Sequence, residues 1–159
     1  MDIGSGKDYP SNALSNFSPH PFILDDVNIS SMEGFLQSLK FKSIEMQEYV
    51  CTLVGYAAKK KGKDKNWKEN QILYWRGEEY KRNSREYQDL LDRAYTELYN
   101  NSKFRAALEA SGTSNLTHNI GKSSIKDTVL TKQEFCSRLM KLRNYGTLEN
   151  KRNITKKLF

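Results

Sequence analysis

The sequence predicts a single α+β domain that is mostly helical and carries long polar loops. Its 159 residues are enough for one domain. Nine Tyr, seven Phe and two Trp give it more aromatic residues than disordered chains usually have. Apolar residues recur at helical spacing in several segments, which polar stretches separate. We expect the domain to span residues 1–146, followed by a mobile basic tail over residues 147–159.

The first elements are a loop and a short hairpin. Three prolines between positions 10 and 21 disfavour a regular helix there. Over residues 22–29, two triplets of β-prone residues flank the turn-forming pair Asp25-Asp26. This arrangement predicts a β-hairpin.

A helix should follow the hairpin. Ser30 and Glu33 have the spacing of a capping box, in which each residue satisfies a backbone N–H near the start of the helix. Phe35, Leu36 and Leu39 then supply an apolar face.

The middle of the chain predicts a second helix over about residues 43–54, with Gly55 as its C-cap. The lysine-rich segment 59–68 reads as a solvated loop. Residues 72–75, Ile-Leu-Tyr-Trp, form a short β-like run.

Residues 85–100 carry the clearest helical pattern, because their apolar side chains recur at three- and four-residue steps. A shorter helix around Phe104 should stop at Gly112. The polar stretch 112–130 predicts a long loop.

The last predicted helix starts with a second capping box. Thr131 and Glu134 have the required spacing, and Phe135 begins the apolar face. Gly146 is placed to end this helix.

The positive charge is concentrated in two segments. Of the net charge of +7, residues 59–68 contribute six Lys against one Asp, and residues 151–159 contribute four basic residues without an acid. The remainder has 16 basic and 18 acidic residues. Such segments attract polyanions or phosphorylated ligands. The alternative is that they only keep a loop and a tail soluble.

Several classes of protein do not fit the sequence. Cys51 and Cys136 match neither a zinc nor a CxxC spacing, so we expect reduced thiols inside helices. The two histidines form no HExxH motif, and a metal site is not predicted. The apolar runs are too short to cross a membrane, and the N-terminus lacks a signal pattern, so a cytoplasmic protein is expected.

Nine strings occur in an order that resembles the YbiA/NADAR (NAD- and ADP-ribose-associated) family, over about residues 9–146. They are LSNFS at 14–18, PF at 21–22, MEGFLQSLKF at 32–41, KNW at 65–67, LYWRG at 73–77, KFRAAL at 103–108, LTHNIGK at 116–122, KDT at 126–128 and EFCSRLMKLR at 134–143. The family has a His directly after the helix glutamate, where this chain has Gly34.

The resemblance implies a YbiA-like domain that hydrolyses the N-glycosidic bond between ribose and a base-like amine, without a metal or redox cofactor. The substrate would be an ADP-ribosyl or ribose-phosphate adduct. Guanine ADP-ribosylated in nucleic acid is preferred, because the basic segments suit a polyanionic carrier. Two alternatives are hydrolysis of phosphorylated riboflavin-pathway intermediates and a non-catalytic module that binds ADP-ribose or nucleic acid.

The resemblance assigns the catalytic carboxylate to Glu33 and, through a looser match, a second acidic group to Asp127. A carboxylate suits this reaction because departure of the nitrogen builds positive charge on the ribose. The competing role for Glu33 is that of capping-box partner to Ser30.

The substrate-binding candidates come from the same strings. Gln37 and Lys40 lie four and seven residues after Glu33, hence on the same helix face. Either Trp67 or Trp75 is expected to stack on the base, although tryptophans are more often core residues. His118 is a candidate to replace the missing histidine. Phosphate binding is the expectation for Arg76, Lys122 and Arg138, with surface salt bridges as the alternative. The full set of binding candidates is Asn16, Phe17, Gln37, Lys40, Trp67, Trp75, Arg76, His118, Gly121, Lys122 and Arg138.

Overall fold

The computed structural model describes residues 1–149, and within them it has seven helices and two antiparallel hairpins. The predicted α+β, mostly helical class is confirmed. The elements are α1 (Ser11–Leu14), β1 (Phe22–Leu24), β2 (Val27–Ile29), α2 (Met32–Ser38), α3 (Ile44–Cys51), α4 (Gly55–Gly62), β3 (Ile72–Trp75), β4 (Glu78–Lys81), α5 (Arg85–Leu98), α6 (Ser102–Ala110) and α7 (Lys132–Tyr145).

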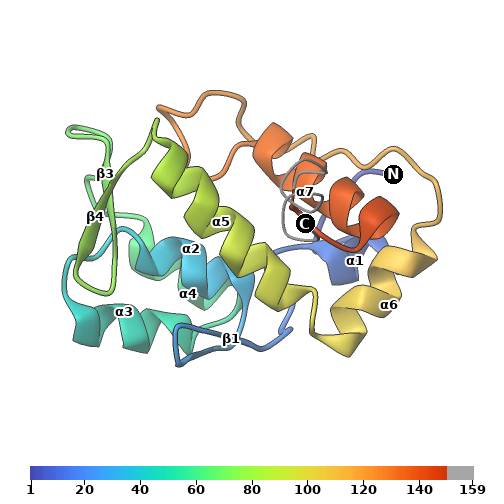
Figure 1. The fold of residues 1–159 in the computed structure, drawn as a ribbon, viewed down its shortest axis with the longest axis horizontal. Coiled ribbons are helices and arrows are strands. Elements are labelled where there is room, and N and C mark those ends of the chain that lie inside the picture. Colours follow the sequence, from blue (N-terminus) through green and yellow to red (C-terminus); the bar gives the residue numbers. More distant parts are fainter. Residues whose placement is uncertain (150–159) are drawn as a thin grey trace, which may run out of the picture.

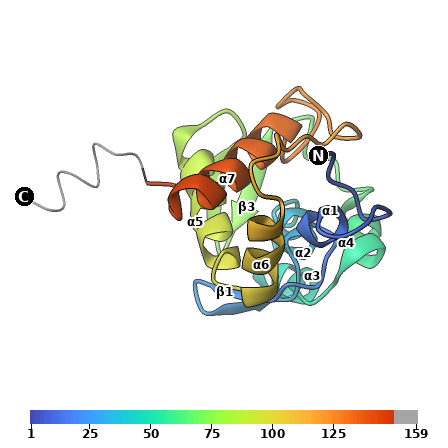
Figure 2. The same ribbon diagram turned by 90° about the vertical axis from the view of Figure 1, so that its right-hand side faces the viewer.

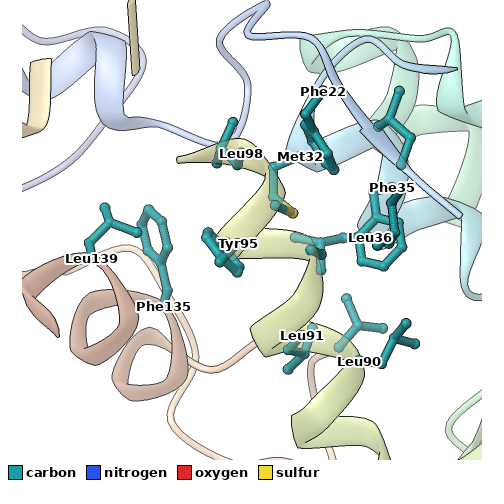
Figure 3. Packing of buried hydrophobic residues seen from close by; sticks show 14 of the residues in the cluster. Phe22, Met32, Phe35, Leu36, Leu90, Leu91, Tyr95, Leu98, Phe135 and Leu139 are labelled. Carbon is teal, nitrogen blue, oxygen red and sulfur yellow. The ribbon is translucent and has the colours of Figure 1, made fainter. Parts of the chain in front are cut away.

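Helix α5 runs through the middle of the molecule and organises the core (Figure 1). Its predicted apolar face is fully buried, with Leu91 and Tyr95 at 0% exposure. Figure 3 shows α5 side chains between residues of α2 and β1 on one side and Phe135 and Leu139 of α7 on the other. Figures 1 and 2 both place α2, α3 and α4 together, away from α7, and Figure 1 shows that α6 also lies apart from them.

The predicted first hairpin is confirmed. Phe22 pairs with Ile29 and Leu24 with Val27. Asp25 and Asp26 form the turn with φ of 49° and 64°. Two positive φ values in succession are those of a type I′ turn, in which Asp is one of the tolerated residues.

The second hairpin, β3–β4, was only half predicted. The β-like run 72–75 is a strand, but it pairs with Glu78–Lys81, a segment that is mostly exposed. Because no side chain of β4 is fully buried, its sequence lacks the apolar alternation by which strands are recognised.

The predicted capping box at the start of α2 is wrong by one residue. Ser31, not Ser30, is the N-cap, and its hydroxyl accepts from the N–H of Gly34. Ser30 instead donates its backbone N–H to the carbonyl of Cys51. Since the cap has shifted, Glu33 occupies the second helical position and its carboxylate bonds to Gln37.

The prediction for the lysine-rich segment was also wrong in part. Helix α3 ends at Cys51, and Gly55 is not its C-cap but the first residue of α4, with φ of 59°. Alanine and lysine have high helix propensity, and Ala58 and Gly62 provide a buried face for α4. The sequence lacks a strong apolar stripe here, which explains why the helix was missed.

The C-terminal half follows the prediction. The capping box of Thr131 and Glu134 is confirmed, and Gly146 ends α7 with φ of 70°. The long loop before α7 is fixed to the core by the hydroxyl of Tyr87, which donates to the carbonyl of Val129. Residues 150–159, most of the predicted basic tail, lie outside the described residues.

Both cysteines are free and buried in helices α3 and α7, as predicted. Burial raises the pKa of each thiol to about 11. Across residues 1–149, none of the helices is long and apolar enough to cross a membrane.

Candidate functional site

The backbone around Glu33 is held by two neighbouring segments. The N–H of Glu33 donates to the carbonyl of Asn16 over 3.0 Å, which ties α2 to the segment 15–18. On the other side, a Cβ at Gly34 would lie 2.7 Å from the carbonyl oxygen of Leu53 and 2.9 Å from that of Val50. This close approach requires glycine at position 34. The family's histidine could not occupy this position without moving α3.

The side chain of Glu33 is oriented by Gln37, one helical turn later. The Nε2 amide of Gln37 donates to Oε1 of Glu33 over 2.9 Å. This bond places Gln37 on the predicted face beside Glu33, whereas Lys40 lies beyond the end of α2 at Ser38. Gln37 is itself only 7% exposed, so the orientation of its amide is fixed by packing.

Helix α4 provides the packing surface for Gln37. A Cβ at Gly62 would lie 2.0 Å from Oε1 and 2.9 Å from Cδ of Gln37, so any larger residue there would force the Gln37 amide to move. The carbonyl oxygen of Gly62 also accepts a long bond of 3.4 Å from Nζ of Lys40. Gly62 therefore lets α4 lie directly against the polar face of α2.

The electrostatic setting of Glu33 is unusual for a helix glutamate. Burial raises the pKa of the Glu33 carboxyl above its ordinary value. The hydrogen bond from Gln37 and the positive charges of Lys40, Lys59 and His118 oppose this shift in part. Carboxyl groups with raised pKa values are typical of residues that exchange protons during catalysis.

Among the basic groups, Lys40 has the largest charge effect on Glu33. Burial lowers its pKa, the Glu33 carboxylate opposes that change, and the positive charges of Lys68, Lys122 and Lys59 lower it further. Lysines from α4, from the segment after it and from the 112–130 loop therefore act on one site. We refer to Glu33, Gln37, Lys40, Lys59, Lys68, His118 and Lys122 as the Glu33 cluster.

His118 is fixed at the cluster by its own contacts. Its Nδ1 lies 2.8 Å from the carbonyl oxygen of Ile3, and its ring meets the ring of Phe135 edge-on at 5.4 Å. Gly121 lies against it, since a Cβ there would be 2.7 Å from Cδ2 of His118. The structure thus brings both residues, predicted from the LTHNIGK string, to one place.

Asn16 reaches the same region from the N-terminal segment. Its Oδ1 accepts from the hydroxyl of Tyr95 over 2.9 Å. The negative charge of Glu33 acts on Tyr95, whose pKa burial raises well above its ordinary value. Phe17 is half-buried and packs against Gly55 at the start of α4.

Three predicted residues have structural contacts of their own. Trp75 is 2% exposed, meets Phe35 edge-on at 5.0 Å and donates Nε1 to Asp25. Arg76 lies in the β3–β4 turn, 3.8 Å from Glu48. Arg138 is buried on α7, where it bonds to Asp92, Gln88 and the carbonyl of Glu134. These contacts support the alternative roles, a core residue for Trp75 and salt bridges for Arg76 and Arg138.

Trp67 and Asp127 remain predictions. Trp67 is 5% exposed and belongs to the hydrophobic core, so stacking on a base would require its surroundings to open. Asp127 is exposed on the loop before α7. Over residues 1–149 its carboxylate has no hydrogen bond or ion pair with any member of the Glu33 cluster.

Sequence reasoning missed three residues of this region. Lys59 and Lys68 were noticed only as part of a charged segment, because their position depends on the unpredicted helix α4. Tyr95 was assigned to the core by its spacing. The available signal was its hydroxyl, since a buried tyrosine usually needs a hydrogen-bond partner.

Two open grooves lie elsewhere on the surface. One, of about 500 Å³, is lined by the first hairpin and the C-terminal end of α5, and the other, of about 390 Å³, lies over Arg138. Their size does not make them the better candidates. The first carries one carboxylate among amides and apolar groups, and in the second Gln88, Asp92, Glu134 and Arg138 are paired with one another. Among the described residues, no three His, Cys, Asp or Glu side chains are grouped as a metal ion would need.

Comparison with known proteins places this geometry in a family. The family model of bacteriophage protein GP30.3 matches residues 8–144. The chain is 37% identical over 147 residues to an uncharacterized 17.1 kDa protein of the Gp30–rIII intergenic region of Enterobacteria phage T4, covering 91% of this chain and 97% of that one. Its fold is similar to the NMR structure of Escherichia coli YbiA, with a TM-score of 0.59 and 19% identity over 99% of this chain and 86% of YbiA. The predicted YbiA-like fold is thereby confirmed, and the chain belongs to the bacteriophage GP30.3 family.

Proposed function

We propose that this protein is an N-glycoside hydrolase that cleaves the bond between ribose and a base, in the cytoplasm, with Glu33 as the catalytic carboxylate. The observation that carries the proposal is the half-buried Glu33 carboxyl, oriented by Gln37 and surrounded by cationic side chains. The preferred substrate is guanine ADP-ribosylated in nucleic acid. This preference rests on the family resemblance and on the basic charge of the molecule.

The reaction breaks the C1′–N bond and forms a C1′–O bond to water. As the nitrogen leaves with the bonding electron pair, positive charge develops on C1′ and the ring oxygen. The Glu33 carboxylate stabilises this charge or takes a proton from the attacking water. The departing nitrogen takes up one proton, so for the preferred substrate the products are the unmodified guanine, still in its strand, and ADP-ribose with a 1′-hydroxyl.

The cluster contains groups suited to each end of such a substrate. Lys122 and Lys68 are exposed and Lys40 is half-buried, so their ammonium groups can pair with phosphate oxygens. Burial is the main cause of the lowered pKa of Lys40 and the neighbouring lysines lower it further, so a bound phosphate would also compensate for their repulsion. Asp127 is proposed as the second acidic group, which would reach the leaving nitrogen through movement of its loop.

The decisive experiment incubates the purified protein with guanine-ADP-ribosylated DNA and, separately, with a ribosylamino-pyrimidine phosphate. Release of ADP-ribose from the first substrate is the expected result. Release of ribose phosphate from the second substrate alone would move the assignment to riboflavin-pathway intermediates.

The control is Glu33→Gln, which keeps the size of the side chain and its bond from Gln37. Turnover that disappears in this variant assigns the activity to the Glu33 cluster. Binding of ADP-ribose by both proteins without release of any product would instead identify a non-catalytic module.

A further inference from the structure

Helix α4 presents an exposed strip of lysine and tyrosine side chains. Ala58 and Gly62 form its buried face, so Tyr56, Lys60 and Lys63 point away from the protein. We define the α4 ridge as Tyr49, Tyr56, Lys59, Lys60, Lys61 and Lys63.

The ridge joins the Glu33 cluster on one side and α3 on the other. Lys59 is the member whose charge acts on Glu33. At the opposite edge, Nζ of Lys61 lies 5.5 Å from the ring centre of Tyr49 on α3. Because Gly62 packs α4 against Gln37, Lys59 lies between the exposed face of α4 and the Glu33 cluster.

The chemistry of the ridge favours one kind of partner. Residues 55–65 contain five Lys and one Asp. Charge alone would serve solubility, but Tyr56 is 68% exposed and Tyr49 is 52% exposed, and large aromatic rings do not improve solubility. Proteins that bind single-stranded nucleic acid combine such cations with aromatic rings on which bases stack.

We propose that the α4 ridge binds single-stranded nucleic acid, with Tyr56 stacked on a base and Lys60 and Lys63 paired with phosphates. In a duplex the bases are already stacked on each other, so the ring of Tyr56 would gain no such contact. The orientation of the strand toward Glu33 rests on the proposed function, whereas binding of unmodified strands does not.

The test measures fluorescence anisotropy of an unmodified labelled strand of about 15 nucleotides, a length within the range that single domains occupy. Lys60→Gln/Lys63→Gln is compared with Lys103→Gln/Lys141→Gln, which removes the same charge from exposed positions on α6 and α7. Between about 50 and 200 mM salt, the ridge variant should reduce the slope of log Kd against log salt by about 1.4, since each lost phosphate contact contributes about 0.7. The control variant should change the slope far less. Equal effects of the two variants would overturn the proposal.

Tyr56 separates stacking from charge. Tyr56→Ala should weaken binding of the single strand about 5- to 150-fold, and Tyr56→Phe should retain most of the affinity. Tyr56→Ala should leave binding of the matching duplex nearly unchanged. Equal losses for strand and duplex would overturn the stacking role.

Two further measurements distinguish a nucleic-acid surface from a membrane surface, and strand binding from catalysis. Tighter binding to vesicles containing phosphatidylserine than to the single strand would identify a membrane surface and refute the ridge assignment. Hydrolysis of a free ADP-ribosyl adduct without binding of strands would refute the ridge but leave the proposed function intact. Binding of strands by an inactive protein would refute the function and leave the ridge assignment intact.

Discussion

Glu33 and Glu134 are both half-buried helix glutamates, yet their environments shift the pKa of their carboxyl groups in opposite directions. Burial would raise the pKa of Glu134, but hydrogen bonds from Arg82, the N–H of Thr131 and Gln88 outweigh it and lower the pKa. Burial also raises the pKa of Glu33, and there the opposing groups are too weak to reverse the shift.

The difference lies in the donors that touch each carboxylate. Arg82, whose side chain is 0% exposed, donates two N–H groups to Glu134, while Gln88 and the N–H of Thr131 add one each. The only direct side-chain bond that the structure gives to Glu33 within residues 1–149 is the one from the neutral amide of Gln37. A carboxylate saturated with donors is a structural ion pair, whereas one left partly unsatisfied and near cations is available for chemistry.

The largest effect should come from breaking the saturated pair. Arg82→Met leaves the Glu134 carboxylate buried without its charged partner, which typically costs about 3–5 kcal/mol of the free energy of unfolding. Urea unfolding measures this loss. The control is Arg93→Met, because Arg93 pairs with Asp25 in an exposed position and should cost less than about 1 kcal/mol. Similar losses in the two variants would contradict the assigned role of Arg82.

The next effect is on catalysis. Glu33→Gln should lower turnover at least about a hundredfold, equivalent to about 2.7 kcal/mol in the activation barrier, because an amide can neither stabilise a ribosyl cation nor take a proton. Its melting temperature should be unchanged or higher, since a penalised buried charge has been removed. ADP-ribose binding should persist.

Glu134→Gln is the matched control for that comparison. It removes the same charge from a saturated site, so we expect lower stability with turnover retained in the folded protein. An active Glu33→Gln enzyme would show that Glu33 is not the catalytic carboxylate, and Asp127 would be the next candidate.

A smaller effect is expected at Gly62. The added methyl group in Gly62→Ala meets Oε1 of Gln37, and such overpacking typically costs about 1–3 kcal/mol, despite the better helix propensity of alanine. Turnover should also fall, since Gln37 must move away from Glu33. Adding Gln37→Ala should restore stability but not turnover. If the double variant shows no such coupling in unfolding measurements, α4 does not position Glu33 through Gln37.

The smallest effect is the dependence of stability on pH. The pKa of Glu33 is raised in the fold, so the folded protein retains a proton that the unfolded chain loses above its ordinary pKa of 4.5. Stability relative to Glu33→Gln should therefore fall as the pH rises from about 4.5 through the raised pKa.

Glu134 should behave in the opposite way, because its pKa is lowered in the fold. Its contribution is present above the unfolded pKa and is lost as the pH falls through the folded pKa. Unfolding free energies of the two Gln variants and the unchanged protein, measured between about pH 3 and 8, check both signs. If the free energies of unfolding of Glu33→Gln and Glu134→Gln change with pH in the same way, the two carboxyl groups do not have opposite pKa shifts.

Much of the fold was predictable because it depends on local patterns. The periodic apolar face of α5, the turn of the first hairpin and the capping box of α7 each involve residues close in sequence, and each is confirmed. Helices α1 and α4 and strand β4 were not predicted. The prolines led us to expect a loop where the four residues of α1 follow Pro10, and neither α4 nor β4 has a strong apolar pattern.

The sequence by itself determined that Glu33 and Gln37 share one helix face, because helical spacing decides this locally, whereas Lys40 lies beyond the end of α2. Only the tertiary structure decided that Ser31 is the cap, that Glu33 is half-buried, and that the charges of Lys59 and His118 act on it. These last facts depend on backbone segments that pack closely at Gly34 and Gly62. Such contacts join residues far apart in the chain, and no local pattern encodes the distance between them.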